Sequence, residues 1–306
     1  DYIRKYFKPL TNEVGRSFED DAAVFSSNKN IEYVLSTDTL VEKIHFLGDE
    51  NPNFIAKKAL RVNLSDLAAM GAEPLYYNLS LSIPPKKVKE FIPSFSKGLK
   101  SDQKKYNIYL IGGDLTASHR YITITISIIG KVLKGKAVSR KGSLNGDYLY
   151  VTGILGLSKI GLDHLKSNMK GLKEAKKKYF FPEPRVEFAF KLSHYINSMI
   201  DISDGLVQDA SHLSKASSLE IHLYLNNIPL PKIRSLKKGY ILKSAMYGGD
   251  DYELLFSATP KNEKNILKLA KEFNIKISRI GYFKKGEKGA LFSNLNKLNN
   301  KSYMHF

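Results

Sequence analysis

Two stretches of strict alternation between apolar and polar residues constrain the fold of this chain more than any other feature. The first covers residues 75–83 and the second residues 121–129. Their apolar members are Leu75, Tyr77, Leu79, Leu81, Ile83, Ile122, Ile124, Ile126 and Ile128. A period of two is that of a β-strand, and one polar face indicates a sheet that is covered on one side only. We therefore predict an antiparallel or mixed sheet with one exposed face.

The segments around these strands predict helices and further strands. Residues 54–70 have helical spacing and stop at Gly71, and residues 86–104 read as an exposed helix. Residues 32–36 and 107–111 read as short strands, which end at Asp38 and at Gly112-Gly113-Asp114. In the second half we expect strands at 148–152, 198–202, 219–225, 252–258 and 276–282, and helices at 155–166, 185–197, 239–246 and 262–273. The predicted class is α+β or mixed α/β.

A basic, glycine-rich stretch at residues 134–147 separates these two halves. The chain has 306 residues, which is enough for about two domains. We therefore predict an N-terminal α/β domain at 1–135 and a C-terminal α/β domain at 136–306.

Composition excludes several kinds of chemistry. There is no cysteine, so disulfides, thiolate zinc sites, iron–sulfur clusters and cysteine nucleophiles are all excluded. The net charge of +18 favours a polyanionic partner, either a nucleic acid or a phosphorylated small molecule. The lysine runs at 176–178, 237–238 and 284–285 lack interleaved aromatic residues and are typical of solvated faces. No long apolar run or signal-peptide pattern is visible, so we expect a cytoplasmic protein with no membrane contact.

The acidic residues of this basic chain stand in unusual places. Asp38 and Asp114 follow predicted strands, Asp66 lies in a predicted apolar helix, and Asp201 lies between isoleucines. Each alone could be an ordinary helix cap or polar contact, as Asp204 could be. Together they indicate a site for Mg²⁺ or Mn²⁺, which prefer oxygen ligands, and hence a phosphate substrate.

The absence of known phosphate-binding motifs limits the kinds of phosphate site that this chain could form. The chain has no P-loop sequence and none of the protein-kinase motifs. A phosphate site would therefore rely on metal ions, on a glycine turn at Gly112-Gly113 and on a cation, for which Arg140 is the best placed. His45 follows Asp38 on a predicted loop and reads, by itself, as an ordinary surface histidine.

A series of motifs resembles the thiamine-monophosphate kinase family, which belongs to the superfamily of aminoimidazole ribonucleotide synthetase. The matching stretches are DDAAV (20–24), STDTLVEKIHF (36–46), ALRVNLSDLAAMGAEP (59–74), LIGGDLT (110–116), SRKG (139–142), GDYLYVTG (146–153), FPEPR (181–185), MIDISDGLVQD (199–209) and GGDDYELLF (248–256). They follow the family order over nearly the whole chain.

This resemblance implies an ATP- and Mg²⁺-dependent kinase that converts thiamine monophosphate to thiamine diphosphate, the last step in making that cofactor. It also implies a two-domain fold like that of aminoimidazole ribonucleotide synthetase and a homodimer built through the N-terminal sheet. On this basis the N-terminal domain carries the acidic residues that bind nucleotide and metal. The C-terminal domain binds the substrate and contributes further metal ligands. In-line transfer needs no general base among the residues.

The family motifs assign roles to individual residues. The implied ligands of several Mg²⁺ ions are Asp21, Ser36, Thr37, Asp38, Asp66, Asp114, Asp201 and Asp204. The implied ATP contacts are Gly113, Asp114, Arg140 and Ser203, and the implied substrate contacts are His45, Asp250 and Tyr303. The chain departs from the family pattern at Ser17-Phe18-Glu19, where glycines are usual, and at Asp250, where glutamate is usual.

Two alternatives stay open at this stage. Aminoimidazole ribonucleotide synthetase is a sibling with the same overall pattern, whereas the selenophosphate synthetase and hydrogenase-maturation siblings depend on cysteine or selenocysteine, which this chain lacks. From a different class, a basic nucleic-acid-binding protein would fit the charge alone. Retention of nucleic acid at physiological salt would distinguish it, because diffuse lysine attraction weakens steeply with salt.

Overall fold

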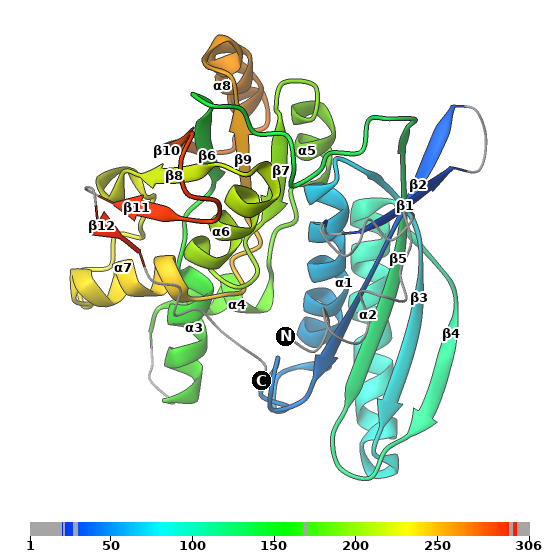
Figure 1. Ribbon diagram of the computed structural model, residues 1–306. Coiled ribbons are helices and arrows are strands. Elements are labelled where there is room, and N and C mark those ends of the chain that lie inside the picture. Colours follow the sequence, from blue (N-terminus) through cyan, green and yellow to red (C-terminus); the bar gives the residue numbers. More distant parts are fainter. Residues whose placement is uncertain (1–19, 21, 27–29, 168–170, 294–295, 299–306) are drawn as a thin grey trace. The chain divides into compact units, whose positions relative to one another are not determined.

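The chain forms two compact units (Figure 1). The computed structural model describes residues 20, 22–26, 30–167, 171–293 and 296–298. Unit 1 comprises the chain up to Leu67 together with Ala72–Ala137, and unit 2 comprises Ala68–Gly71 together with the chain from Val138 onward. The predicted break after residue 135 lies just before this division. The segment Ala68–Gly71 is tied to the rest of unit 2 by a bond from the Val138 N–H to the Met70 carbonyl of 3.0 Å.

Unit 1 is built on a five-stranded mixed sheet, as the alternation predicts. Its spatial order is β1-β2-β5-β3-β4, and every neighbouring pair is antiparallel except β3 and β4. Its strands are β1 (Ala23–Ser26), β2 (Ile31–Val41), β3 (Glu73–Ile83), β4 (Tyr109–Ala117) and β5 (Thr123–Leu133).

The helices that the structure describes in unit 1 lie along one face of this sheet. Figure 1 shows α1 (Pro52–Ala69) and α2 (Val88–Tyr106) along that face, and a short 3₁₀ turn (Pro85–Lys87) precedes α2. Ile124, Ile126 and Ile128 of β5 are completely buried, which confirms the predicted inward face. The helix predicted as exposed is amphipathic instead, because α2 buries Phe91, Phe95, Leu99 and Asp102.

The strand predicted at 107–111 is longer than its sequence indicates. β4 continues through the two glycines to Ala117, and Leu79 of β3 pairs with Gly113. The prediction of a glycine turn at Gly112-Gly113 is therefore wrong. A Cβ atom on Gly113 would lie 1.9 Å from the Leu79 carbonyl oxygen, so glycine is required for β4 to approach β3.

Unit 2 contains a seven-stranded sheet of order β12-β11-β8-β10-β6-β9-β7, in which only the β8–β11 pair is parallel. Its strands are β6 (Tyr148–Thr152), β7 (Ser198–Asp201), β8 (Glu220–Leu223), β9 (Leu254–Ala258), β10 (Ile277–Lys284), β11 (Leu291–Ser293) and β12 (Asn296–Lys297). Its helices are α3 (Leu157–Lys166), α4 (Lys173–Phe180), α5 (Val186–Leu192), α6 (Leu206–Ser217), α7 (Lys238–Tyr247) and α8 (Glu263–Glu272), with 3₁₀ turns at Leu225–Asn227 and Pro260–Asn262. Helix α4 is absent from the sequence-based prediction, and α5 is shorter than predicted.

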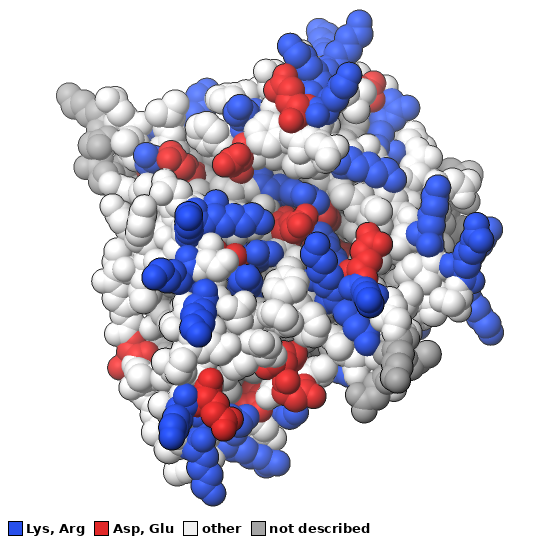
Figure 2. All heavy atoms as spheres, turned by 180° about the vertical axis from the view of Figure 1, so that it is seen from behind, with Lys and Arg blue, Asp and Glu red and all other residues white. Residues whose placement is uncertain are grey.

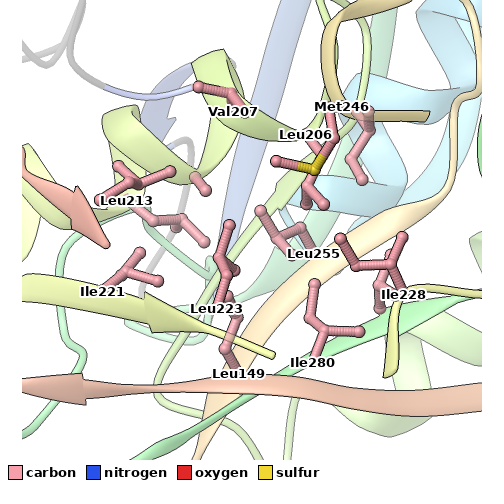
Figure 3. Close-up of a cluster of buried hydrophobic side chains, with 14 of the residues drawn as sticks. Leu149, Leu206, Val207, Leu213, Ile221, Leu223, Ile228, Met246, Leu255 and Ile280 are labelled. Carbon is pink, nitrogen blue, oxygen red and sulfur yellow. The ribbon is translucent and has the colours of Figure 1, made fainter. Parts of the chain in front are cut away.

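The main core of unit 2 lies between its sheet and α6 and α7. Figure 3 shows Leu149, Ile221, Leu223, Leu255 and Ile280 of the strands meeting these helices. The helices contribute Leu206, Val207, Leu213 and Met246 to this cluster. Burial of these side chains fixes the ends of β7 and β9, from which the acidic loops of this unit emerge.

The positive charge is dispersed on the face that Figure 2 shows. Lysine and arginine side chains are scattered over this face, and acidic side chains gather in a few small groups among them. Within the described residues, no helix has the length and apolar character needed to cross a membrane.

Candidate active site

The first acidic group of unit 1 lies between β2 and α1. Because β2 extends to Val41, Ser36 and Asp38 are inside the strand rather than after it. Residues two apart share a face of a strand. The Ser36 hydroxyl donates to the Asp66 carboxylate (2.6 Å), and the Asp38 N–H donates to the Asn63 side-chain oxygen (3.1 Å). Asp66 and Asn63 are one helical turn apart on α1, so the structure brings Ser36, Asp38 and Asp66 together.

Thr37 lies on the opposite face of β2. Its hydroxyl donates to the Ser127 hydroxyl (2.9 Å) on β5, next to a Thr39–Thr125 pair on the same exposed face. The Thr37 side chain therefore cannot bind the same ion as Ser36 and Asp38. A ligand from Thr37 would have to be its backbone carbonyl.

Asp114 and Gly113 are likewise separated from this group. Strands β5 and β3 lie between β2 and β4, which places β4 about 14 Å from β2 at ordinary strand spacing. Asp114 pairs with Ser80, which is on the exposed face, and its carboxylate accepts the N–H of Leu115 (2.9 Å). Within one copy of the chain, Asp114 does not join Asp38 and Asp66.

The turn after β2 holds His45 in a fixed orientation. The Val41 N–H donates to Nδ1 of His45 (3.0 Å), so the proton of a neutral imidazole is on Nε2. Buried Glu42 anchors this turn by accepting the Ile122 N–H (2.9 Å) and the Lys87 ammonium (2.6 Å). In a neutral His45, Nε2 is therefore the N–H donor of the ring.

Unit 2 holds a second acidic group, at the end of β7 and the start of α6. Asp201 and Asp209 are buried, and the Asp204 N–H donates to the Asp209 carboxylate (3.2 Å). Burial raises the pKa of Asp209 well above its usual range, and the negative charges of Asp204 and Asp201 raise it further. The charge of Arg140 opposes this rise, which indicates that Arg140 lies near the second acidic group. Sequence reasoning missed Asp209, although it ends the MIDISDGLVQD motif.

A loop between α7 and β9 lies against this second group. The Asp250 N–H donates to the Ser203 carbonyl (2.9 Å), and the Tyr252 N–H donates to the Ile202 carbonyl (2.8 Å). Asp250 and Tyr252 both have positive φ, 68° and 49°. The structure therefore places Ser203 and Asp250 side by side.

Two buried acids flank Tyr252 in that loop. Asp251 accepts the N–H of Gly156 (2.6 Å), at the start of α3, and burial raises the pKa of Asp251 to about 7. Glu253 contacts Lys178 (2.6 Å) and Arg185 (2.9 Å). Burial alone would raise the pKa of Glu253, but these two cations lower it. The prediction of a solvated face is therefore wrong at Lys178, whose side chain is only 12% exposed.

The donor sets of both groups consist of oxygen atoms, which suit Mg²⁺. Among the described residues, however, no three acidic or histidine side chains already form a metal-binding group. Each acidic group would thus need further ligands from phosphate, water or residues elsewhere. Asp21 and Tyr303, which the family motifs assign to metal and substrate, lie outside the described residues.

Comparison with known proteins identifies the family. The N-terminal and C-terminal domains described as AIR synthase related protein match residues 19–132 and 145–294. Thiamine-monophosphate kinase of Buchnera aphidicola subsp. Schizaphis graminum is 39% identical over 295 residues, which cover 94% of this chain and 90% of that protein. The chain belongs to the thiamine-monophosphate kinase family.

Solved structures of thiamine-monophosphate kinases share its fold. The enzyme from Stenotrophomonas maltophilia superimposes with a TM-score of 0.83 at 30% identity, over 90% of this chain and 89% of that one. A structure described as AaThiL complexed with AMPPCP and TMP superimposes with a TM-score of 0.88 at 28% identity, over 99% of this chain and 96% of that one. The predicted two-domain fold and family are confirmed.

Proposed function

We infer that this chain is a thiamine-monophosphate kinase, which transfers the γ-phosphoryl group of ATP to thiamine monophosphate and releases thiamine diphosphate. The observation that carries this conclusion is family membership along nearly the whole chain. The related protein complexed with AMPPCP, an analogue of ATP, and TMP supports the same pair of reactants here.

The nucleophile of this reaction is a phosphate oxygen. Its second pKa is about 6, so the attacking oxygen is ionised at neutral pH without a base from the protein. Two anionic groups must therefore be brought together in line, and the main task of the residues is orientation and charge neutralisation. The described acidic groups suit that task better than proton transfer.

We propose that Mg²⁺ is held by Ser36, Asp38 and Asp66 in unit 1 and by Asp201 and Asp204 in unit 2. Bound Mg²⁺ would supply the positive charge that offsets the polyphosphate. The negative charges of Asp204 and Asp201 raise the pKa of Asp209, and the positive charge of Arg140 offsets this rise only in part. This repulsion among Asp201, Asp204 and Asp209 supports a cation at the second group. Asp21 stays a proposed ligand through its motif alone, and Thr37 through its carbonyl.

Contacts to the two substrates are proposed from the neighbouring residues. Arg140 and Ser203 are the proposed contacts to ATP in unit 2, and Gly113 and Asp114 are the proposed contacts on β4. His45 would donate from Nε2 to thiamine monophosphate, and Asp250 would face it from the loop before β9. Tyr303 stays a proposed substrate contact through its motif.

We also propose a homodimer that uses the sheet of unit 1. Every residue of β4 is exposed, including Tyr109 (56%) and Leu115 (58%). An apolar edge strand of this kind favours pairing with a second copy. A second copy would also give Asp114 a route to the acidic group of its partner, which it cannot reach within its own unit. We place the enzyme in the cytoplasm, because it consumes ATP.

A coupled assay tests this assignment. With Mg²⁺ and ATP, we expect thiamine monophosphate to give ADP and thiamine diphosphate, and free thiamine to give neither, because thiamine lacks the attacking phosphate. The control substrate is formylglycinamidine ribonucleotide, which the aminoimidazole ribonucleotide synthetase alternative would consume. Turnover of thiamine as fast as its monophosphate, or of the ribonucleotide alone, would overturn the assignment.

A further inference from the structure

The loop Gly248–Glu253 of unit 2 holds an unusual backbone shape. Asp250 and Tyr252 have left-handed φ values of 68° and 49°, which side-chain-bearing residues seldom adopt. Gly249 approaches Ser203 so closely that a Cβ atom would lie 2.3 Å from its carbonyl oxygen. Strained backbone of this kind persists only where the surroundings over-determine it.

The surroundings that determine this shape are two buried carboxylates at alternate positions. Asp251 is completely buried and accepts the N–H of Gly156. Glu253 is 1% exposed, and its oxygens accept the Thr152 hydroxyl (2.7 Å), the Lys178 ammonium (2.6 Å) and the Arg185 guanidinium (2.9 Å). Asp250 itself is only half-buried, and its N–H donates to the Ser203 carbonyl.

Lys178 and Arg185 come from a different part of the chain, α4 and the FPEPR segment. Both side chains are largely buried, with 12% and 18% exposed. An unpaired charge at such a position is strongly unfavourable, so buried Glu253 requires a cation beside it, and it has two. The anchor of the loop is therefore an ion cluster whose cations are remote in sequence from the loop.

We propose that Lys178 and Arg185 are positioning residues, which act through Glu253 to hold the Gly248–Glu253 loop in the shape that presents Asp250 to thiamine monophosphate. The presentation of Asp250 rests on the proposed function, whereas the anchoring of the loop does not. Lys178 and Arg185 contact the anchor rather than the reacting groups. They should therefore affect substrate affinity more than the chemical step.

Hydrogen exchange tests the anchoring independently of activity. In Lys178→Met, Glu253 still pairs with Arg185, so we expect the fold to be retained and the anchor to be weakened. We expect the Asp250 and Tyr252 amides, which bond to Ser203 and Ile202, to exchange at least about tenfold faster than in wild type. Lys178→Arg should restore slow exchange. The matched control is Glu263→Gln. Glu263 also pairs with an arginine, Arg279 (3.5 Å), but Glu263 lies on α8 and not in the Gly248–Glu253 loop.

Kinetics test the presentation of Asp250. In Lys178→Met we expect the KM for thiamine monophosphate to rise at least about fivefold, with the KM for ATP and kcat within about twofold. Lys178→Arg should recover most of the lost affinity, and Glu263→Gln should change neither KM.

Each failure has a separate signature. Wild-type exchange rates in folded Lys178→Met would overturn the anchoring. Fast exchange with an unchanged KM for thiamine monophosphate would overturn the presentation of Asp250. An inactive wild-type enzyme would instead overturn the proposed function, while the exchange rates would still decide the anchoring.

Discussion

The two acidic groups of the molecule are stabilised in opposite ways. In unit 1, the Ser36 hydroxyl donates to the Asp66 carboxylate, and the Asn63 side chain holds the Asp38 backbone by accepting its N–H. In unit 2, Asp204 accepts the Gln208 side-chain amide (2.8 Å), and burial together with the charges of Asp204 and Asp201 raises the pKa of Asp209. Neutral hydrogen-bond partners therefore connect the first group, whereas repulsion between carboxylates raises the pKa of Asp209 in the second group, and a cation would relieve that repulsion. Metal binding should therefore stabilise unit 2 more than unit 1.

Removing one acid from either group should have the largest effect. We expect Asp66→Asn and Asp201→Asn each to lower kcat by at least about 10²-fold, because each change removes a strong electrostatic stabiliser while it keeps shape. Steady-state formation of thiamine diphosphate measures this. The matched control is Asp163→Asn, which removes a carboxylate from a Lys159 pair outside both groups. Near wild-type kcat in either variant would make that acid structural.

Asp114 sharpens the comparison, because it lies apart from both Ser36 and Asp66. We expect Asp114→Asn to lose activity as severely as Asp66→Asn, if a second copy brings Asp114 to the first group. Co-refolding the two inactive variants should then restore activity to about a quarter of wild type, since half of the dimers are mixed and each has one intact site. No recovery in mixed dimers would mean that Asp114 does not act across copies.

Repulsion among the acids of unit 2 predicts that stability, unlike activity, increases when one of these acids is removed. A folded-state pKa that is raised means that the folded chain binds more protons than the unfolded chain, so stability falls as pH rises from about 4 through the raised values of Asp209 and Asp251. Without metal at pH 8, we expect Asp209→Asn to raise Tm by about 2 °C or more. Asp66→Asn should leave Tm nearly unchanged, because Ser36 can still donate to it.

Thermal unfolding in EDTA and in Mg²⁺ separates the two groups further. Mg²⁺ should raise the Tm of wild type more than that of Asp209→Asn, because less repulsion is left to relieve. A lower Tm for Asp209→Asn in EDTA would contradict this prediction. It would show that favourable contacts of the Asp209 carboxylate outweigh its repulsion from the neighbouring acids.

The smallest effect is expected at Asp250. Aspartate tolerates a left-handed φ better than most residues, which gives a physical reason for aspartate where the family usually has glutamate. We expect Asp250→Glu to change the KM for thiamine monophosphate by less than about twofold, if water fills the gap before the substrate. The KM for ATP should be unchanged. A changed KM for ATP alone would place this loop at the wrong substrate.

Sequence patterns predicted the sheet of unit 1 well where local alternation decides burial, as at Ile124 and Tyr77. They were wrong at strand ends, because the extent of β2 and β4 depends on pairing of Asp38 with Ile126 and of Gly113 with Leu79. Local sequence cannot show such pairing. The same limit explains Lys178, whose partner Glu253 lies in a distant segment, and Asp209, whose neighbours are acids rather than a recognisable ligand pattern.

The pairing of the Ser203 loop with the Asp250 loop also dictates an order of assembly. Ile202 and Ser203 are made long before Asp250, and α6, β8 and α7 lie between them in the chain. Closing so long a segment is slow, because chain entropy is lost before the contacts form. During synthesis, the segment with Asp201 and Asp204 therefore lacks its contacts to the Asp250 loop until β9 has been made. A nascent chain that stops before β9 would leave β7 without this partner strand, so the contact between the two loops forms late in folding.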